Sequence, residues 1–485
     1  MTIIKQKIKD MKKITLLLVI LLSFFTHSTI ISQSSDIELR FHPELDKFDL
    51  KKYALPVIDY KSLDMNFILN STSNTWDIRS KEDYKDLTFM FFINNKIFKN
   101  SPRLQMKGNN TIQLGVAWEN YRNKDNNKKI NDTGLNISYN INDNFKFYNG
   151  SKRFFEIDVK SDLSINNGDQ FGYYLNHRIF NGTFWGTTIG LGMGYGRLED
   201  VTDAWTTIRM LKEFSRINRL KKVPDDIDIV SIAETVSKIK NARFFDSRIK
   251  RIEKLKAIDK IMQEKGLITN DDISYFTTMS DVFEYSRFLH PRRFAGKIIA
   301  LDLRPHYSLI DGESILSHQN YYSYGLGIEF RDQYYIPLNI FKQIDFGYSI
   351  NLDYSKISAI NNKSKNNSLL SIIPQVFVNY SYYITSRSTY YSNFDFALFQ
   401  LLKSKIEIDT DSPTYTMAWT NKFSYYISPR ARFDINLLLL YNNVQYRYNG
   451  FYLQRYEWGG VRLLTPFISK GFNYDLSMRF KYAIF

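Results

Sequence analysis

Long, unbroken alternation of apolar and polar side chains is the feature that most constrains this sequence. From Ile344 to Tyr354 every second residue is apolar or aromatic, and the residues between them are Asp, Gly, Ser or Asn. Side chains with this period of two point to opposite faces of a β-strand. The run is about twice as long as the ~5–6 residues of an average globular strand. Segment 342–357 therefore predicts a long strand with one apolar and one polar face.

The same pattern recurs along most of the chain and is compatible with two folds. One is a soluble antiparallel sheet with a wet face, and the other is a transmembrane β-barrel with an apolar exterior and a polar lumen. Strand length favours the barrel, because ~9–11 tilted residues cross a bilayer. Tyr and Trp near strand ends, such as Trp118, Tyr348 and Trp419, also fit interfacial girdles. A barrel also explains why a chain with an aromatic share of 16% has a polar mean hydropathy of −0.34. The rings lie on one face of each strand, and polar residues lie on the other.

The number of strands follows from the candidate segments. These are 63–70, 86–93, 110–122, 132–141, 152–163, 171–178, 183–196, 297–309, 320–331, 342–357, 370–384, 389–402, 413–427, 430–446, 450–463 and 472–485. Bacterial barrels prefer even numbers, and some segments are doubtful, above all the region 447–470. We predict an all-β transmembrane antiparallel barrel of about 14 strands, within a range of 12–16. Residues 63–196 and 296–485 are its two parts.

The N-terminus has the organisation of an export signal. Lys12 and Lys13 precede the apolar stretch 14–25, and small or polar residues follow. We predict a signal peptide at 1–32, cleaved near Ser32, with an uncleaved anchor as the alternative. The chain has no cysteine, which excludes a lipid anchor through Cys and a disulfide-stapled module. Its net charge of +15 suits anionic lipid more than nucleic acid, because export removes the chain from nucleic acid; a scattered surplus is the alternative.

The C-terminal segment 472–485 alternates Phe, Tyr, Leu and Met with Asn, Asp, Ser, Arg and Lys, and ends in Phe485. It resembles bacterial outer-membrane β-barrel proteins, whose last strand commonly ends in Phe. The resemblance implies location in the outer membrane, contact with its lipids and lipopolysaccharide, and insertion by the outer-membrane assembly machinery through this strand. Phe485 departs from the pattern because it falls on the polar register unless a bulge intervenes. The lead segment 33–62 is too short for the plug domain of siderophore-type receptors.

Alternation stops between residues 197 and 295, where helical spacing replaces it. We predict an insert of about four helices, with these apolar faces: Val201, Trp205, Ile208 and Leu211; Ile227, Val230, Ala233 and Val236; Ile249, Ile252, Leu255 and Met262; and Phe276, Met279 and Phe283. The insert is a candidate plug, periplasmic cap or outer lid, and strand parity favours the periplasmic side. Its basic residues Arg243, Arg248, Lys250 and Arg251 are candidates for docking a periplasmic partner, with a solvated helix face as the alternative.

No catalytic, metal or cofactor motif is found in the sequence, and we expect no enzymatic activity and no cofactor. The pairs His306/Ser308 and Ser317/His318 are too common to indicate catalysis. The repeat Gly190–Gly196 is interpreted as a bare strand face, not a phosphate loop, that makes room for something packed in the lumen, with the insert as the candidate.

Five polar residues are predicted to face the lumen: Glu156, Asp158, Asp345, Asn351 and Asp353. By alternation they lie opposite the apolar residues of their strands, so they would keep a pore wet and bias the passage of solutes. The predicted function is a porin-like or gated channel for small solutes. The alternative is a non-transporting anchor whose insert binds an envelope partner. The pattern predicts no oligomeric state.

Overall fold

A computed structural model provides the fold. It describes residues 43–74, 82–123, 128–150, 152–167, 181–242, 247–269, 271–287, 292–314, 317–359, 366–385, 387–404, 414–428, 431–442, 457–458, 461–462 and 471–482. The predicted signal peptide, Arg243 and Phe485 lie outside these residues.

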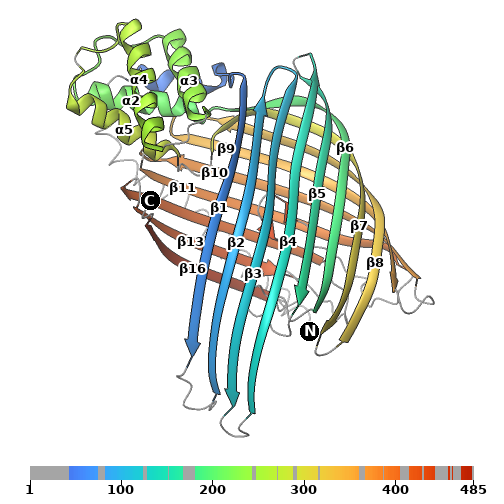
Figure 1. Cartoon of the computed structure of the whole chain (residues 1–485). Coiled ribbons are helices and arrows are strands. Elements are labelled where there is room, and N and C mark those ends of the chain that lie inside the picture. Colours follow the sequence, from blue (N-terminus) through green and yellow to red (C-terminus); the bar gives the residue numbers. More distant parts are fainter. Residues whose placement is uncertain are drawn as a thin grey trace, which may run out of the picture.

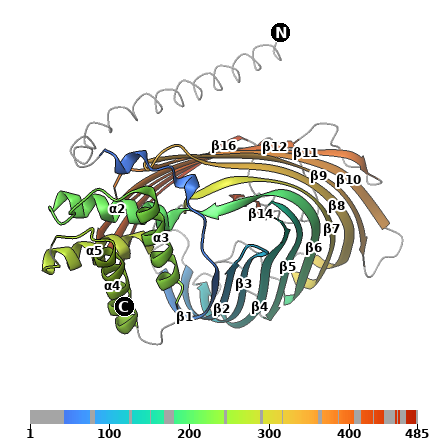
Figure 2. The ribbon, with the colours of Figure 1, turned by 90° about the horizontal axis from the view of Figure 1, so that it is seen from above.

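Fourteen strands form one antiparallel sheet in which each strand pairs with the next along the chain. They are β1 (Ile58–Asn74), β2 (Glu82–Asn100), β3 (Leu104–Asn123), β4 (Lys128–Asn149), β5 (Arg153–Asn167), β6 (Asn181–Asp200), β7 (Phe294–Ser314), β8 (Ser317–Pro337), β9 (Lys342–Ala359), β10 (Asn366–Tyr383), β11 (Ser388–Ser404), β12 (Thr414–Ser428), β13 (Ala431–Asn442) and β16 (Gly471–Tyr482). The sheet is strongly curled (Figures 1 and 2). A separate hairpin pairs β14 (Glu457–Trp458) with β15 (Val461–Arg462).

The predicted fold class, a 14-stranded antiparallel barrel fold with an α-helical insertion, is confirmed. Fourteen of the sixteen candidate segments coincide with strands of the main sheet. Segment 171–178 lies outside the described residues, and within 450–463 only the β14–β15 hairpin is described. β1 and β16 are the first and last strands, and no ladder joins them within the part of the chain that the structure describes.

Cross-strand register assigns each side chain to the outer or inner face. Phe89, Val116 and Leu135 lie in one row across β2, β3 and β4, and all three are exposed. The residues that flank them along the strands are small or polar apart from Met90, and all are less exposed: Thr88, Met90, Gly115, Ala117, Gly134 and Asn136. This arrangement gives an apolar outer surface, as contact with lipid requires, and a polar inner surface.

The helical insert joins β6 to β7 at the end of the sheet that carries its short connections. It contains α2 (Thr202–Arg216), α3 (Asp226–Lys240), α4 (Ser247–Glu264) and α5 (Ile273–Arg287), and two short 3₁₀ helices, η3 (Leu45–Lys47) and η4 (Leu50–Lys52), precede β1. The turns β8–β9 and β10–β11 lie at the same end of the sheet (Figure 1). None of the described helices is both long and apolar enough to cross a membrane.

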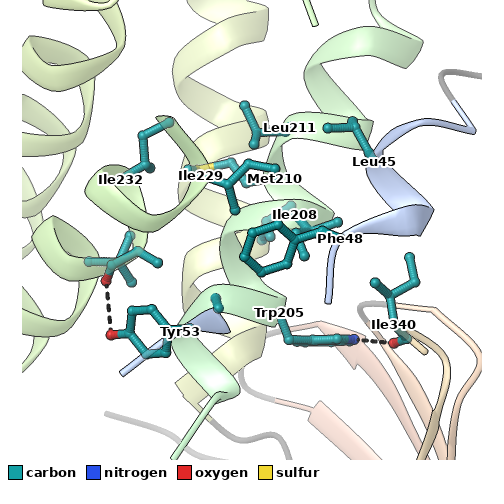
Figure 3. Close-up of a cluster of buried hydrophobic side chains, with 14 of the residues drawn as sticks. Leu45, Phe48, Tyr53, Trp205, Ile208, Met210, Leu211, Ile229, Ile232 and Ile340 are labelled. Atoms are coloured by element: carbon teal, nitrogen blue, oxygen red, sulfur yellow. Dashed lines mark hydrogen bonds between the residues drawn. The ribbon is translucent and has the colours of Figure 1, made fainter. Parts of the chain in front are cut away.

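The insert has its own hydrophobic core, and the lead segment is part of it. Leu45, Phe48, Leu50 and Tyr53 are buried with residues of α2, α3, α4 and α5 (Figure 3). Tyr53 also forms a 2.8 Å hydrogen bond with Ser237 of α3. The predicted face of α2 is buried as expected. The predicted face of α3 is wrong at one position, because Ile227 is 74% exposed, whereas Ile229 and Ile232 are buried.

Hydrogen bonds to backbone carbonyls fix the insert to the rim of the sheet. The Trp205 indole donates to the Ile340 carbonyl in the β8–β9 turn at 2.7 Å (Figure 3). Arg293 donates to the same carbonyl at 2.6 Å and to the Asn339 carbonyl at 2.7 Å, and Arg209 donates to the Tyr383 carbonyl at 2.8 Å. Because the ends of these strands carry otherwise unpaired carbonyls, the buried donors also satisfy the rim.

We expect the substitution Trp205→Ala to destabilise the docked insert by about 3–5 kcal/mol, because it removes a fully buried ring and its hydrogen bond. Hydrogen exchange of the α2 amides in the folded full chain measures the effect. Ile227→Ala is the matched control, and its exposed side chain predicts a change within about 0.5 kcal/mol. Unchanged protection of α2 in the Trp205 variant would contradict this account of docking.

Candidate functional site

A compact group of charged side chains lies on the inner face of strands β4 to β8. It contains the carboxylates Glu156, Asp158, Asp302 and Glu329 and the cations Lys146, Arg304 and Arg331, and we call it the charged layer. Register explains the grouping, because Glu156, Gly192, Asp302 and Glu329 occupy one row across β5, β6, β7 and β8. All four carboxylates are buried.

Each cation of the charged layer contacts at least one carboxylate. Arg304 reaches Glu329 at 2.6 Å and Asp158 at 3.5 Å. Arg331 hydrogen-bonds Glu156 and lies 3.3 Å from Asp302, and Lys146 lies 3.4 Å from Glu156. Buried charges are costly unless they are paired. The layer is therefore a cross-braced part of the wall in which every carboxylate contacts at least one basic side chain.

Glycines on β6 leave space in which charged side chains from β5 can meet charged side chains from β7 and β8. A Cβ at Gly192 would lie 1.8 Å from Asp302 Oδ1, and a Cβ at Gly190 would lie 3.1 Å from the Asp158 Cβ. The sequence correctly predicted a bare inner face here, but the expected occupant was wrong. Side chains of β5 and β7 fill the space over these glycines, while the insert lies at the rim.

A second polar group joins β7 to β9 beside the charged layer. His306 Nε2 lies 3.1 Å from Ser355 Oγ, and His306 Nδ1 lies 3.6 Å from Asp353 Oδ1. Ser355 donates its hydroxyl proton to Asp353 Oδ2 at 2.7 Å. A catalytic serine donates its proton to histidine instead, so this arrangement does not activate Ser355. The neighbouring Ser308, considered with His306 from the sequence, bonds Ser323 at 2.7 Å.

The structure places the five predicted lumen residues on the inner face but in four different settings. Glu156 and Asp158 belong to the charged layer, and Asp353 bonds Ser355. Asn351 lies beside Glu329 in register, and its side-chain oxygen has no hydrogen-bond partner among the described residues. Asp345 lies near the rim that carries the insert, where it accepts a hydrogen bond from Gln343 at 2.7 Å. Their effect on solutes stays a prediction.

The predicted docking residues of the insert are less informative. Arg248, Lys250 and Arg251 belong to α4, but their side chains, like Arg243, lie outside what the structure describes.

Five residues of the charged layer were not singled out from the sequence: Asp302, Arg304, Glu329, Arg331 and Lys146. The signal was present for Glu329 and Arg331, which alternate with Ile328 and Phe330.

The end of the insert farthest from the sheet is held by an ion pair. Arg219 Nε donates to Asp272 Oδ1 at 3.2 Å, and an isolated bridge joins Leu220 to Ile268. Asp272 also accepts hydrogen bonds from Ser274 and the Tyr275 amide in the first turn of α5. The hydrogen bond from Arg219, followed by those in the first turn, holds the pKa of Asp272 well below its usual range.

Comparison with known proteins gives no family for this chain. No protein-family profile matches it, and no curated protein matches it. Solved structures that align with it include outer-membrane expressed OmpT of Vibrio cholerae, at 9% identity over 88% of this chain and 99% of that chain, with a TM-score of 0.29. A CymD monoaromatic hydrocarbon channel aligns at 8% identity over 80% of this chain and 85% of that chain, with a TM-score of 0.26. Pseudomonas aeruginosa OpdQ aligns at 7% identity over 79% of this chain and 94% of that chain, with a TM-score of 0.19. Likenesses at this level transfer no site and no substrate.

We expect Gly192→Ala to destabilise the sheet by about 1–3 kcal/mol, because the added methyl group overlaps the Asp302 carboxylate. Gly186→Ala is the matched control on the same face of β6, where the nearest atom is the flexible end of Phe184 at 3.3 Å. Urea unfolding of both variants in detergent measures the difference. Equal stability of the two variants would show that the charged layer does not depend on the glycine.

We expect the distal end of the insert to loosen as pH falls below about 4. A carboxylate with a depressed folded pKa stabilises the fold above its unfolded pKa of ~3.9, and this contribution is lost as pH falls through the folded pKa. Hydrogen exchange in the first turn of α5 measures the loosening. Asp272→Asn should remove the pH dependence, and an unchanged pH profile in that variant would refute the assignment.

Proposed function

We propose that the protein is an outer-membrane channel through which small polar solutes pass along the inner face of the curled sheet. The observation that carries the proposal is the inner face itself, where charged residues are paired into the wall across β4 to β8. Paired charges keep a lumen wet without binding ions tightly, which suits passage more than storage.

The position of the insert supports passage over a permanent plug. Trp205, Arg209 and Arg293 attach it to the β8–β9 and β10–β11 turns, and Figure 2 shows its helices at one side of the curled sheet. Short connections are typical of the periplasmic end of bacterial barrels. We therefore propose that the insert lies in the periplasm, after export by the 1–32 signal peptide and insertion through the C-terminal strand.

A second candidate function is a membrane anchor whose insert binds an envelope protein. The observation in its favour is a pair of strongly exposed isoleucines at the starts of two helices, Ile227 (74%) in α3 and Ile273 (82%) in α5. Two isolated apolar side chains are weak evidence, because single exposed apolar residues are common on protein surfaces. We therefore keep the channel as the main proposal.

Purified full-length mature protein in planar lipid bilayers should give discrete conductance steps, and absence of steps would contradict the channel. Arg304→Gln should shift the reversal potential in a salt gradient toward cation selectivity, because it removes a cation from between Asp158 and Glu329. Lys260→Gln is the control, since its side chain is exposed on α4 of the insert and is not part of the inner face of the sheet. An equal shift in both variants would show that the charged layer does not face the permeation path.

A further inference from the structure

A further polar cluster, on strands β9 to β11 of the inner face, differs from the charged layer because its hydrogen-bond acceptors have no matching cations. Asp345, Asn379 and Asn393 occupy one row across β9, β10 and β11, and Asp395 lies two residues after Asn393 on the same face. We call these four residues the acceptor cluster. Adjacent strands are ~4.8 Å apart, so the row spans about 10 Å, the size of a small ligand.

The acceptor cluster has oxygen atoms that are not satisfied by the protein. Asn393 is only 6% exposed, yet its Oδ1 has no hydrogen-bond partner among the described residues, and neither has Asn379 Oδ1. The orientation of Asn393 is fixed because its amide nitrogen donates to Asp395. A flipped amide would place oxygen against that carboxylate. Its free oxygen therefore points away from Asp395, and a buried unsatisfied acceptor favours an external donor.

Charge in the acceptor cluster is also incompletely compensated. Neither Asp345 nor Asp395 makes an ion pair within the part of the chain that the structure describes, in contrast to every carboxylate of the charged layer. The cation nearest to Asp345 in the hydrogen-bond network is Arg293, which reaches it only through Gln343. Arg293 itself is committed to the carbonyls of the β8–β9 turn.

Tyrosines complete the surroundings. Tyr335 lies directly beside Asp345 in the β8–β9 register, and Tyr391 lies two residues before Asn393 on the same face of β11. A primary ammonium group offers three donors and no acceptor, which matches this arrangement of oxygens, and aromatic rings attract cations. One oxygen of Asp345 and one of Asp395 already accept hydrogen bonds from Gln343 and Asn393, so four oxygens of the cluster remain, fewer than the six to eight oxygen ligands that Ca²⁺ takes.

We propose that the acceptor cluster of Asp345, Asn379, Asn393 and Asp395 is a binding subsite for small primary ammonium compounds. This inference rests on the proposed function only in that solutes must reach the inner face. It names amines as a solute class that the channel holds on its path, at the end of the sheet where the insert docks.

Isothermal titration of the full-length protein in detergent with propylammonium tests the proposal independently of conductance. We expect saturable one-site binding that is weaker by about tenfold or more in Asp345→Asn and in Asp395→Asn, since each loses a charge-assisted hydrogen bond. Tetramethylammonium, which has the same charge but no donor, should bind at least about tenfold more weakly than propylammonium. Asp64→Asn is the matched control, because Asp64 faces inward on β1 and is paired with Lys96 at 2.8 Å.

The outcomes separate this subsite from the channel. Binding with no conductance would support the subsite and contradict the channel, whereas conductance without propylammonium binding would overturn the subsite alone. Equal binding of both ammonium ions, or equal loss in Asp64→Asn, would also overturn it. Heat-dependent gel migration verifies that each variant is folded, and the two single variants provide separate tests if one of them fails to fold.

Discussion

Backbone pairing is the constraint on which the rest of this structure depends. A chain that crosses lipid has to satisfy its peptide groups internally, and long antiparallel strands do so with their neighbours. Once strands pair, a slip of one residue would exchange the apolar and polar faces. The row from Phe89 through Val116 to Leu135 fixes the exterior, and the same register places Glu156, Asp302 and Glu329 in one row inside. The charged layer is thus a consequence of the exterior pattern combined with the glycines of β6.

The insert illustrates how a helical unit is joined to such a sheet. Its core is made by α2 to α5 together with the lead segment, so residues on both sides of the first six strands contribute to one helical unit. The insert meets the sheet in two ways: Trp205, Arg209 and Arg293 donate hydrogen bonds to carbonyls at the rim, and Ile340 and Tyr383 of the rim are buried in the core of the insert. All of these anchoring contacts lie at one end of the sheet.

Sequence predicted the fold well and the site only in part, for identifiable physical reasons. Alternation is a local signal, so the strands and their two faces could be predicted from the sequence. Helical spacing is local too, and it predicted the buried face of α2 correctly. In α3 two apolar phases overlap, and the buried one begins at Ile229 and not at Ile227. The ion pairs of Arg304 and Arg331 depend on which strands lie beside β6 and on the space left by Gly190 and Gly192. Neither fact can be obtained from spacing along one strand.

The contrast between the two inner clusters is itself informative about solutes. In the charged layer every carboxylate contacts a basic side chain, so its charge is paired within the protein even where single atoms, such as both Asp302 oxygens, have no hydrogen-bond partner among the described residues. In the acceptor cluster Asn393 and Asn379 keep unsatisfied oxygens beside two carboxylates without ion pairs. An unsatisfied buried acceptor costs stability, and the cost is offset when a donor binds. In the proposed channel, selectivity would therefore depend less on the charged layer, whose carboxylates are paired with basic side chains, than on the acceptor cluster, whose carboxylates make no ion pair among the described residues.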